Sequence, residues 1–303
     1  MIAPTALPRT GLLCVAHGTV ENLEEMADFL KVIRRGRPPS EELIHELVMR
    51  YTKIGGSPLN RVTARQAEAL GQALGLPSLW GMRLWKPWVA DVLRENLSRF
   101  DRVCVLPLAP FSVHVYQAAA AEALASVLNG SKGPELIAVE PWGSHPAYVE
   151  WFAGRIEKML AQSSAKTRVI LTAHSLPTRA IQTGDPYQAQ VNACAQLISS
   201  RLGTKAVLAY QSQGADGGDW LGPDLKAALE QAPKEGQERV IVAPIGFVSE
   251  HVETLYDLDI EATKWAKDLG LVWERVSAPN DDPAFVKVLV DVVERALARS
   301  AAS

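Results

Sequence analysis

RVCVLPLAPFSVHVY at residues 102–116 and RVIVAPIGFVSEHVE at residues 239–253 are two copies of one pattern. They align without a gap at a constant offset of 137 positions, and seven of the fifteen aligned residues are identical. Each copy begins with a short apolar run typical of a buried strand and continues into a turn and a helix start. The chain therefore contains a duplicated strand–turn–helix unit, which predicts two similar lobes.

Short apolar runs rich in β-branched residues recur four times in each half of the chain. They alternate with stretches of helical periodicity, such as residues 62–74 and 118–128. Strands that are apolar on both faces and separated by crossover-length helices form parallel sheets covered on both sides. The predicted fold is α/β, with a four-stranded parallel sheet in each lobe. The predicted strands are residues 12–16, 79–84, 103–108, 136–140, 168–172, 205–210, 239–244 and 271–276.

The boundary between the lobes is predicted at NGSKGP, residues 129–134, where glycine, proline and polar residues cluster. The N-terminal lobe is then residues 1–134 and the C-terminal lobe residues 135–281. Residues 282–303 form a further helix, which could pack back on the N-terminal lobe.

The composition narrows the class of protein. The 303 residues are 48% hydrophobic, which excludes disorder as the main state, and 31 Lys and Arg face 34 Asp and Glu, which argues against a nucleic-acid partner. Three cysteines without CxxC spacing build neither a disulfide framework nor an iron–sulfur cluster. The apolar GLLCVA at residues 11–16 is too short for a membrane span or a signal peptide. We expect a soluble cytoplasmic protein, with peripheral membrane contact left open.

Two histidines each follow a predicted strand, in LLCVAHGT at His17 and in VILTAHSLP at His174. In open α/β sheets, ligands bind beyond the carboxyl ends of the strands. We therefore expect both histidines to point into a cleft between the lobes. A helix cap or a loop hydrogen bond is an equally good interpretation of either histidine alone.

The segment GFVSEHVETLYDLDIEA, which begins at Gly246, follows a predicted strand. Gly246 suits a tight turn, and Ser249 suits the N-cap of the next helix. Glu253, Asp257 and Glu261 then recur at i, i+4 and i+8, which places three carboxylates on one helix face. Such a row could bind or conduct a cation, but a solvated acidic face explains it as well.

Arginines gather in VIRRGRPP at Arg34, Arg35 and Arg37, and Arg50 and Tyr51 follow in VMRYTKIGGSPL. Guanidinium groups suit bidentate binding of carboxylates, although an ordinary basic loop has the same composition. The sequence contains no GxSxG, HExxH or GxGxxG motif, so the usual local signals of hydrolases, zinc proteases and dinucleotide-binding enzymes are missing.

Several segments together resemble the ferrochelatase family: VAHGT, IRRGRPP, RYTKIGGSPL, TAHSLP, GDPY, YQSQG, WLGPD and PIGFVSEHVETLYDLD, in the same order and over nearly the whole chain. IRRGR and YQSQG resemble the coproporphyrin III ferrochelatases in particular. The resemblance implies two Rossmann-like, chelatase-type lobes with the active site between them. It also implies insertion of Fe²⁺ into a porphyrin in haem biosynthesis, with iron as a substrate and no permanently bound cofactor, in a protein we expect to be monomeric.

The resemblance also assigns roles to residues. It implies that His174 and Glu253 are catalytic and bind the metal, and that Asp257 and Glu261 extend the metal path. Porphyrin contacts are implied for His17, Arg34, Arg50, Tyr51, Ser57 and Tyr116. At His17 the coproporphyrin III enzymes usually have a tyrosine, and PLAPFSVHVY is several residues shorter than their equivalent loop, so both contacts differ from the family pattern.

Two other functions remain compatible with these residues. Cobalt or nickel chelatases that act on sirohydrochlorin also have a histidine at the position of His17, although GDPY and YQSQG resemble ferrochelatase. A haem or porphyrin carrier could use the same cleft without catalysing a reaction.

Overall fold

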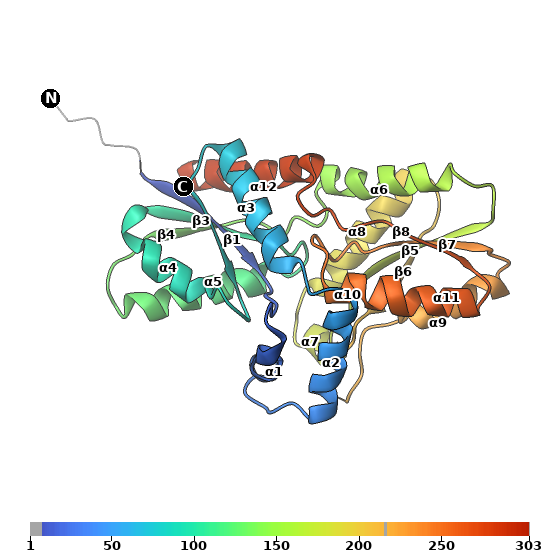
Figure 1. The fold of residues 1–303 in the computed structure, drawn as a ribbon. Coiled ribbons are helices and arrows are strands. Elements are labelled where there is room, and N and C mark those ends of the chain that lie inside the picture. The colour runs from blue at the N-terminus through green and yellow to red at the C-terminus, as the bar shows by residue number, and fades with distance from the viewer. Residues whose placement is uncertain (1–7, 215–216, 303) are drawn as a thin grey trace.

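The computed structural model describes residues 8–214 and 217–302; the ends of the predicted lobes at residues 1–7 and 303 lie outside them. Within the described part, the chain forms two four-stranded parallel sheets with the same strand order (Figure 1). The orders are β2–β1–β3–β4 and β6–β5–β7–β8. This repeated order confirms the α/β fold with two similar lobes that the duplication predicts.

All eight predicted strands are present, with ends that differ by a few residues. They are β1 (Thr10–Ala16), β2 (Ser78–Met82), β3 (Arg102–Pro107), β4 (Glu135–Ala138), β5 (Thr167–His174), β6 (Val207–Gln211), β7 (Arg239–Ala243) and β8 (Val272–Arg275).

The predicted helices at residues 62–74 and 118–128 are parts of α3 (Leu59–Leu74) and α5 (Val113–Leu128). The other helices of the described residues are η1 (Leu23–Glu25), α1 (Met26–Ile33), α2 (Glu41–Lys53), α4 (Val89–Asn96), η2 (Leu97–Arg99), α6 (Pro146–Leu160), α7 (Thr178–Gln182), α8 (Tyr187–Leu202), α9 (Leu225–Lys234), α10 (Val252–Leu255), the π-helix η3 (Asp257–Ala262), α11 (Thr263–Asp268) and α12 (Pro283–Ala302).

The central strands of each sheet are buried on both faces, to which successive side chains of a strand point in turn. In β1, Leu12 and Cys14 belong to a large apolar cluster that also contains Leu171 of β5, so this cluster joins the two lobes. Leu13 and Val15 point the other way and pack with α4 and α5. The continuous apolar runs in the sequence follow from this two-sided burial.

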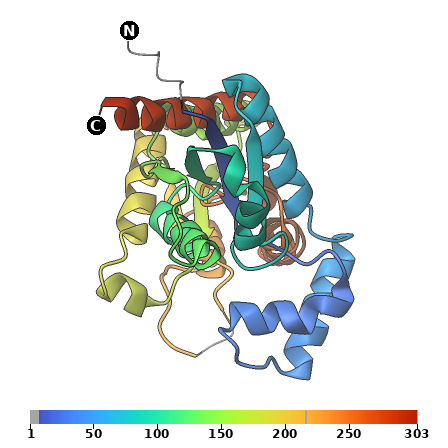
Figure 2. The same ribbon diagram turned by 90° about the vertical axis from the view of Figure 1, so that its left-hand side faces the viewer.

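Helix α12 packs against elements of both lobes. It contacts α3, β3 and α6, and also β4, which pairs with β3 and so extends the first sheet beyond the predicted lobe boundary at residue 134. It runs along one side of the molecule (Figures 1 and 2). Phe285 is 0% exposed in the shared cluster, and Asp291 lies 2.6 Å from Nε2 of His145, the N-cap of α6. The last helix therefore links the lobes instead of standing apart.

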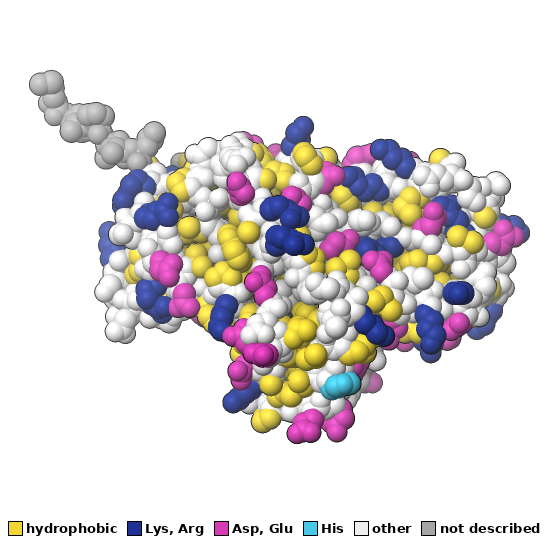
Figure 3. All heavy atoms as spheres, in the orientation of Figure 1, with side chains coloured by type: hydrophobic (Ala, Val, Ile, Leu, Met, Phe, Trp, Pro, Cys, Tyr) yellow, Lys and Arg dark blue, Asp and Glu magenta, His cyan; other side chains and the backbone are white. Residues whose placement is uncertain are grey.

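Helices α1 and α2 project from the body of the molecule (Figure 1). Met26, Phe29 and Leu30 of α1 form a small buried cluster with Tyr51 and Trp85. Hydrophobic side chains also gather on the surface of this projection, bordered by acidic and basic ones (Figure 3). The basic segment IRRGRPP joins the two helices, which places it on the projection.

Candidate active site

His17 and His174 occupy corresponding places in the two lobes, since His17 follows β1 and His174 ends β5. His17 is exposed and the side chain of His174 is 34% exposed. Both imidazoles interact electrostatically with Glu253. The structure thus brings together three side chains that lie far apart in the sequence.

Glu253 reaches this place through a tight packing contact between two strand ends. A side chain at Gly246 would bring its Cβ within 2.9 Å of the Cα of Ala173, the residue before His174. Only glycine avoids that clash, so the loop after β7 lies directly against the end of β5. The loop leads into α10, where Glu253 stands in the first turn.

The structure corrects the predicted start of this helix. The N-cap of α10 is His251, whose backbone is extended and whose backbone N–H donates to the Thr254 hydroxyl at 3.0 Å. Ser249 does not cap the helix, because its hydroxyl donates to Oε1 of Gln66 on α3 at 3.3 Å. The Ser249 hydroxyl, which the sequence suggested as a helix cap, therefore binds Gln66 of the other lobe instead.

Glu253 lies between two imidazoles. Its Oε1 is 3.6 Å from Nε2 of His174, and its Oε2 is 3.6 Å from Nε2 of His251. Burial opposes ionisation of the carboxyl, but the neighbouring His174 and His251 outweigh it and lower the pKa of Glu253 to about 2. Glu253 is therefore a carboxylate at neutral pH, held in place by Gln211, whose Nε2 donates to the Glu253 backbone carbonyl at 2.7 Å.

His17 faces this carboxylate from the N-terminal lobe. Its side chain is exposed, yet the surrounding protein removes enough hydration to lower the pKa of His17 to about 4, and Arg83 acts in the same direction. His17 is therefore a neutral imidazole at physiological pH, with a lone pair available to a proton or a metal ion.

A pocket of about 240 Å³ lies along the acidic row and is also lined by Ser175 and Gln211, the neighbours of His174 in the chain and in the sheet. Asp257 and Glu261 both line it, together with Arg50 and Ser212. Asp257 accepts a hydrogen bond from Ser212 and pairs with Arg50 Nη1 at 3.0 Å. Burial, helped by the nearby charge of Glu253, raises the pKa of Asp257 to about 6, although Ser212 and Arg50 act against it.

The helix that carries the acidic row is not the regular α-helix that the i, i+4, i+8 spacing predicts. Residues 257–262 form a π-helix, in which the Glu261 N–H donates to the Tyr256 carbonyl at 3.0 Å. Such wide turns often occur at functional sites. Within the described residues, no three His, Cys, Asp or Glu side chains are close enough together to bind one metal ion.

The residues predicted to contact a porphyrin occupy different environments. Arg50 pairs with Glu46 and Asp257 and lies over the ring of Tyr256. Tyr51 is 3% exposed, and its hydroxyl shares a 2.9 Å hydrogen bond with Thr19.

Three further predicted contacts are partly exposed. Tyr116 lies beneath the guanidinium of Arg83, at 5.7 Å from the ring centre. Arg34 ends α1 on the projection, and Ser57 lies in the loop between α2 and α3. These three side chains therefore retain a surface that a ligand can reach.

Sequence reasoning missed Arg83, Gln211, Ser212 and Gln66. Gln211 and Ser212 stand in the YQSQG motif, whose role becomes visible only when the end of β6 is placed beside His174. Arg83 lies in GMRLWKPW, where the tryptophans attract attention first. No local signal marks Gln66.

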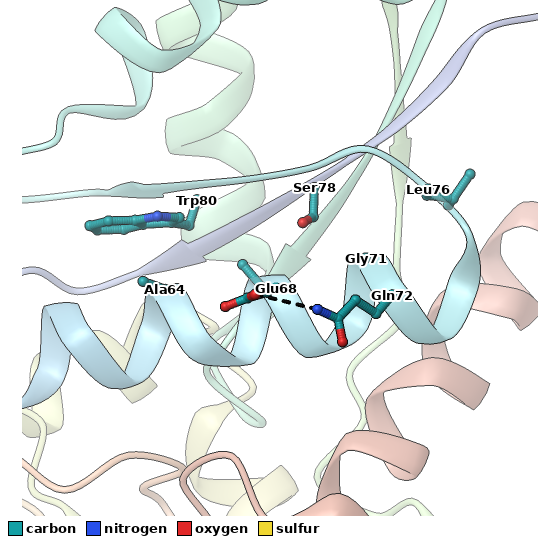
Figure 4. Close-up of a pocket in the computed structure, with 8 residues that line it drawn as sticks. Ala64, Glu68, Gly71, Gln72, Leu76, Ser78 and Trp80 are labelled. Carbon is teal, nitrogen blue, oxygen red and sulfur yellow. Dashed lines mark hydrogen bonds between the residues drawn. The ribbon is translucent and has the colours of Figure 1, made fainter.

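A groove of about 600 Å³ lies elsewhere, between α3 and the edge strand β2 (Figure 4). Its one charged lining side chain, Glu68, accepts a hydrogen bond from Gln72 at 3.3 Å. Leu76 and Ser78 place it at the amino-terminal end of β2, whereas His17 follows the carboxyl end of the neighbouring β1. The groove is larger than the acidic pocket but carries none of the titratable side chains of the site.

The family model described as Ferrochelatase matches residues 9–297. The chain belongs to the ferrochelatase family. A ferrochelatase from Acidobacterium capsulatum is 34% identical, over 97% of both chains. A coproporphyrin III ferrochelatase from Anoxybacillus flavithermus is 35% identical, over 93% of this chain and 95% of the relative.

Solved structures agree with the fold. SirB from Bacillus subtilis with Fe³⁺ covers 97% of this chain and 98% of its own, with a TM-score of 0.64 and 14% identity. Family membership makes the chain an enzyme that inserts iron into a porphyrin in haem biosynthesis. Within the described residues, no helix combines the length and the hydropathy needed to cross a membrane.

Proposed function

We propose that the chain inserts Fe²⁺ into coproporphyrin III, with the porphyrin bound between the lobes and His174 and Glu253 on the side where the metal enters. The observation that carries this proposal is the 3.6 Å approach of Glu253 to His174 at the end of β5, facing His17 of the other lobe. The relatives named coproporphyrin III ferrochelatase support the choice of substrate.

Metallation removes two protons from the pyrrole nitrogens, whose acidity in a flat ring is too low for water to accept them at neutral pH. An imidazole changes its protonation state near neutral pH, so His174 is suited to accept a proton on the metal side. Glu253 is ionised and partly exposed, so it attracts Fe²⁺ toward the ring or accepts the second proton. Walls that bind a bent ring better than a flat one would lower the barrier further.

The role of His174 is tested by His174→Ala. We expect loss of iron insertion, with porphyrin binding still measurable by the shift of its Soret band. The assay is run anaerobically with Fe²⁺ and coproporphyrin III, protoporphyrin IX or sirohydrochlorin, and Co²⁺ replaces Fe²⁺ in a parallel series. Wild-type turnover by the variant would contradict the role, and faster metallation of sirohydrochlorin would contradict the substrate.

The choice of porphyrin is tested at Arg34, which together with Arg35 and Arg37 makes the loop between α1 and α2 basic. Coproporphyrin has four carboxylates and protoporphyrin has two, so a guanidinium that binds carboxylates should favour the former. We expect Arg34→Leu to raise the KM for coproporphyrin more than the KM for protoporphyrin. The exposed Arg94 of α4 serves as the control in Arg94→Leu, and equal effects of Arg34→Leu on both porphyrins would argue against the assignment.

A further inference from the structure

Gln66 is a buried side chain of the N-terminal lobe whose polar atoms all bind the C-terminal lobe. It stands on α3 and is 0% exposed. Its Nε2 donates to the backbone carbonyls of Asn280 at 2.7 Å and Val248 at 3.2 Å, and its Oε1 accepts from the Ser249 hydroxyl at 3.3 Å. A carboxamide has two N–H donors and one carbonyl, and here each has a partner. Neither an acid nor an apolar side chain of the same length can make this set of bonds.

The partners of Gln66 belong to two loops that are also bonded to each other. The Asn280 backbone N–H donates to the Val248 carbonyl at 2.8 Å, and the Asn280 side chain accepts from the Glu250 N–H at 2.8 Å. Glu250 is bonded in turn by Arg275 at 2.9 Å. Gln66 therefore fixes a connected, inflexible piece of the C-terminal lobe against α3.

This piece leads directly into the catalytic pair. The Ser249 backbone carbonyl lies 3.0 Å from Nδ1 of His251, so that nitrogen carries the proton and donates it. The other ring nitrogen of His251 then faces Glu253 at 3.6 Å, and Glu253 faces His174 at the same distance. Contacts thus run without a break from an N-terminal helix to the two residues on the metal side.

We propose that Gln66 is a positioning residue that holds His251 and Glu253 at a fixed place relative to the N-terminal lobe. The inference rests on the proposed function, in which the N-terminal lobe supplies the porphyrin contacts Arg34, Ser57 and Tyr116. The distance from ring to proton acceptor then depends on how the lobes are joined. A displacement of about 1 Å at a reacting group can cost a hundredfold in rate.

The test compares Gln66→Met with Arg65→Met. Arg65 is the neighbouring residue of α3, and its guanidinium pairs with Asp281 at 2.7 Å across the same lobe boundary, but at an exposed position. Both variants are assayed well below their unfolding temperatures. We expect Gln66→Met to lower kcat at least tenfold with the porphyrin KM within twofold of wild type. Arg65→Met should keep both constants within twofold.

A readout without turnover separates positioning from general damage. The imidazole resonance of His251, recorded by NMR at one fixed pH without substrate, should move in Gln66→Met and stay in place in Arg65→Met. Gln66→Glu keeps the length of the side chain but points a carboxylate at two carbonyls, so it should behave like Gln66→Met. If Gln66→Met does not fold, Ser249→Ala removes one link of the chain and should move the same resonance.

An unchanged kcat in folded Gln66→Met, or an unmoved His251 resonance, would overturn the proposal. Equal losses of kcat in Gln66→Met and Arg65→Met would also overturn it. Failure of the proposed function is distinguishable, because it appears as wild-type turnover by His174→Ala, while the His251 resonance still reports on Gln66.

Discussion

Glu253 and Asp257 are the same chemical group four residues apart, yet their environments move their pKa values in opposite directions. Two imidazoles lower the pKa of Glu253 to about 2, whereas burial raises the pKa of Asp257 to about 6. At active sites, two titratable groups whose pKa values are shifted apart commonly act as the acid and the base. At neutral pH, Glu253 is ionised in the resting protein, and Asp257 is the member of the row that takes up and releases a proton close to neutrality.

The raised pKa of Asp257 predicts a pH-dependent effect of Asp257→Asn on stability. The folded carboxyl binds its proton more tightly than the unfolded one, whose ordinary pKa is 3.8, so ionisation between about pH 4 and pH 6 favours unfolding. The shift corresponds to at most about 3 kcal/mol. We expect the Tm of the variant, relative to wild type, to increase from pH 4 to pH 7 in metal-free buffer.

Asp281→Asn provides a control of opposite sign. The hydrogen bond from Arg65 lowers the pKa of Asp281, so its ionised form stabilises the fold above the ordinary pKa and that stability is lost as the pH falls. The Tm of this variant relative to wild type should therefore decrease as the pH rises to about 4 and stay nearly constant from pH 4 to pH 7. Differential scanning fluorimetry at several pH values measures both, and parallel trends in the two variants would refute the assignment for Asp257.

The residues that could be predicted are those marked by their own neighbourhood. His17 and His174 follow apolar runs, and Glu253 follows a turn and a helix start, so the rule on strand ends is enough to place them. Gln66 could not be predicted, because its partners Val248 and Ser249 lie more than 180 positions away. Arg50 illustrates the same limit, since one of its two carboxylate partners, Asp257, lies on the other lobe.

At the scale of elements, periodicity predicts that a helix is present but not how it is wound. The acidic segment was predicted to be helical, and it is, but residues 257–262 turn as a π-helix. Residues 253–262 contain neither Gly nor Pro, and their carboxylates recur at the spacing of an ordinary helix, so the sequence contains no sign of the wider turn. The wider turn is made by backbone hydrogen bonds such as that from the Glu261 N–H to the Tyr256 carbonyl. Asp257 and Glu261 both line the acidic pocket.

Two glycines in helices predict opposite effects of the same substitution. Gly75 ends α3 with φ +64° and open space around it, and Gly154 lies inside α6 with only the Glu150 side chain near, at 3.7 Å from a new Cβ. Alanine should cost about 1 kcal/mol at Gly75, where the left-handed backbone disfavours a Cβ, and stabilise α6 by about 0.5–1 kcal/mol at Gly154.

Urea unfolding of Gly75→Ala and Gly154→Ala measures these effects as shifts of the midpoint at constant slope. Since neither new methyl group meets a close neighbour, backbone conformation is the main difference between the two sites. Destabilisation of equal size in both variants would show that packing, and not the backbone conformation of the glycine, determines the change in stability.

At the scale of the whole molecule, the duplication predicts two lobes, but it does not predict that they share one core. Side chains of β1 and β5 belong to a single apolar cluster. Apolar side chains of α12 belong to the same cluster, and α12 contacts elements of both lobes. Helix α12 follows β8 as α6 follows β4, at the same offset of 137 positions, but the repeat does not predict that these two helices pack against each other between the lobes. A rigid connection of this kind suits a site whose two histidines come from different lobes.

Phe285 of α12 tests whether the lobes unfold as one unit. It is 0% exposed, and its ring lies 6.1 Å from Trp142, 6.0 Å from Tyr148 and 6.5 Å from Trp151, measured between ring centres. Phe285→Ala should cost about 3–5 kcal/mol, because the packed rings cannot close the cavity completely. Since the cluster is common to both sheets, hydrogen exchange under conditions that report global opening should accelerate equally in β1 and β5. Acceleration in β5 alone would mean that the lobes are independent folding units and that the shared cluster holds them together only in the native state.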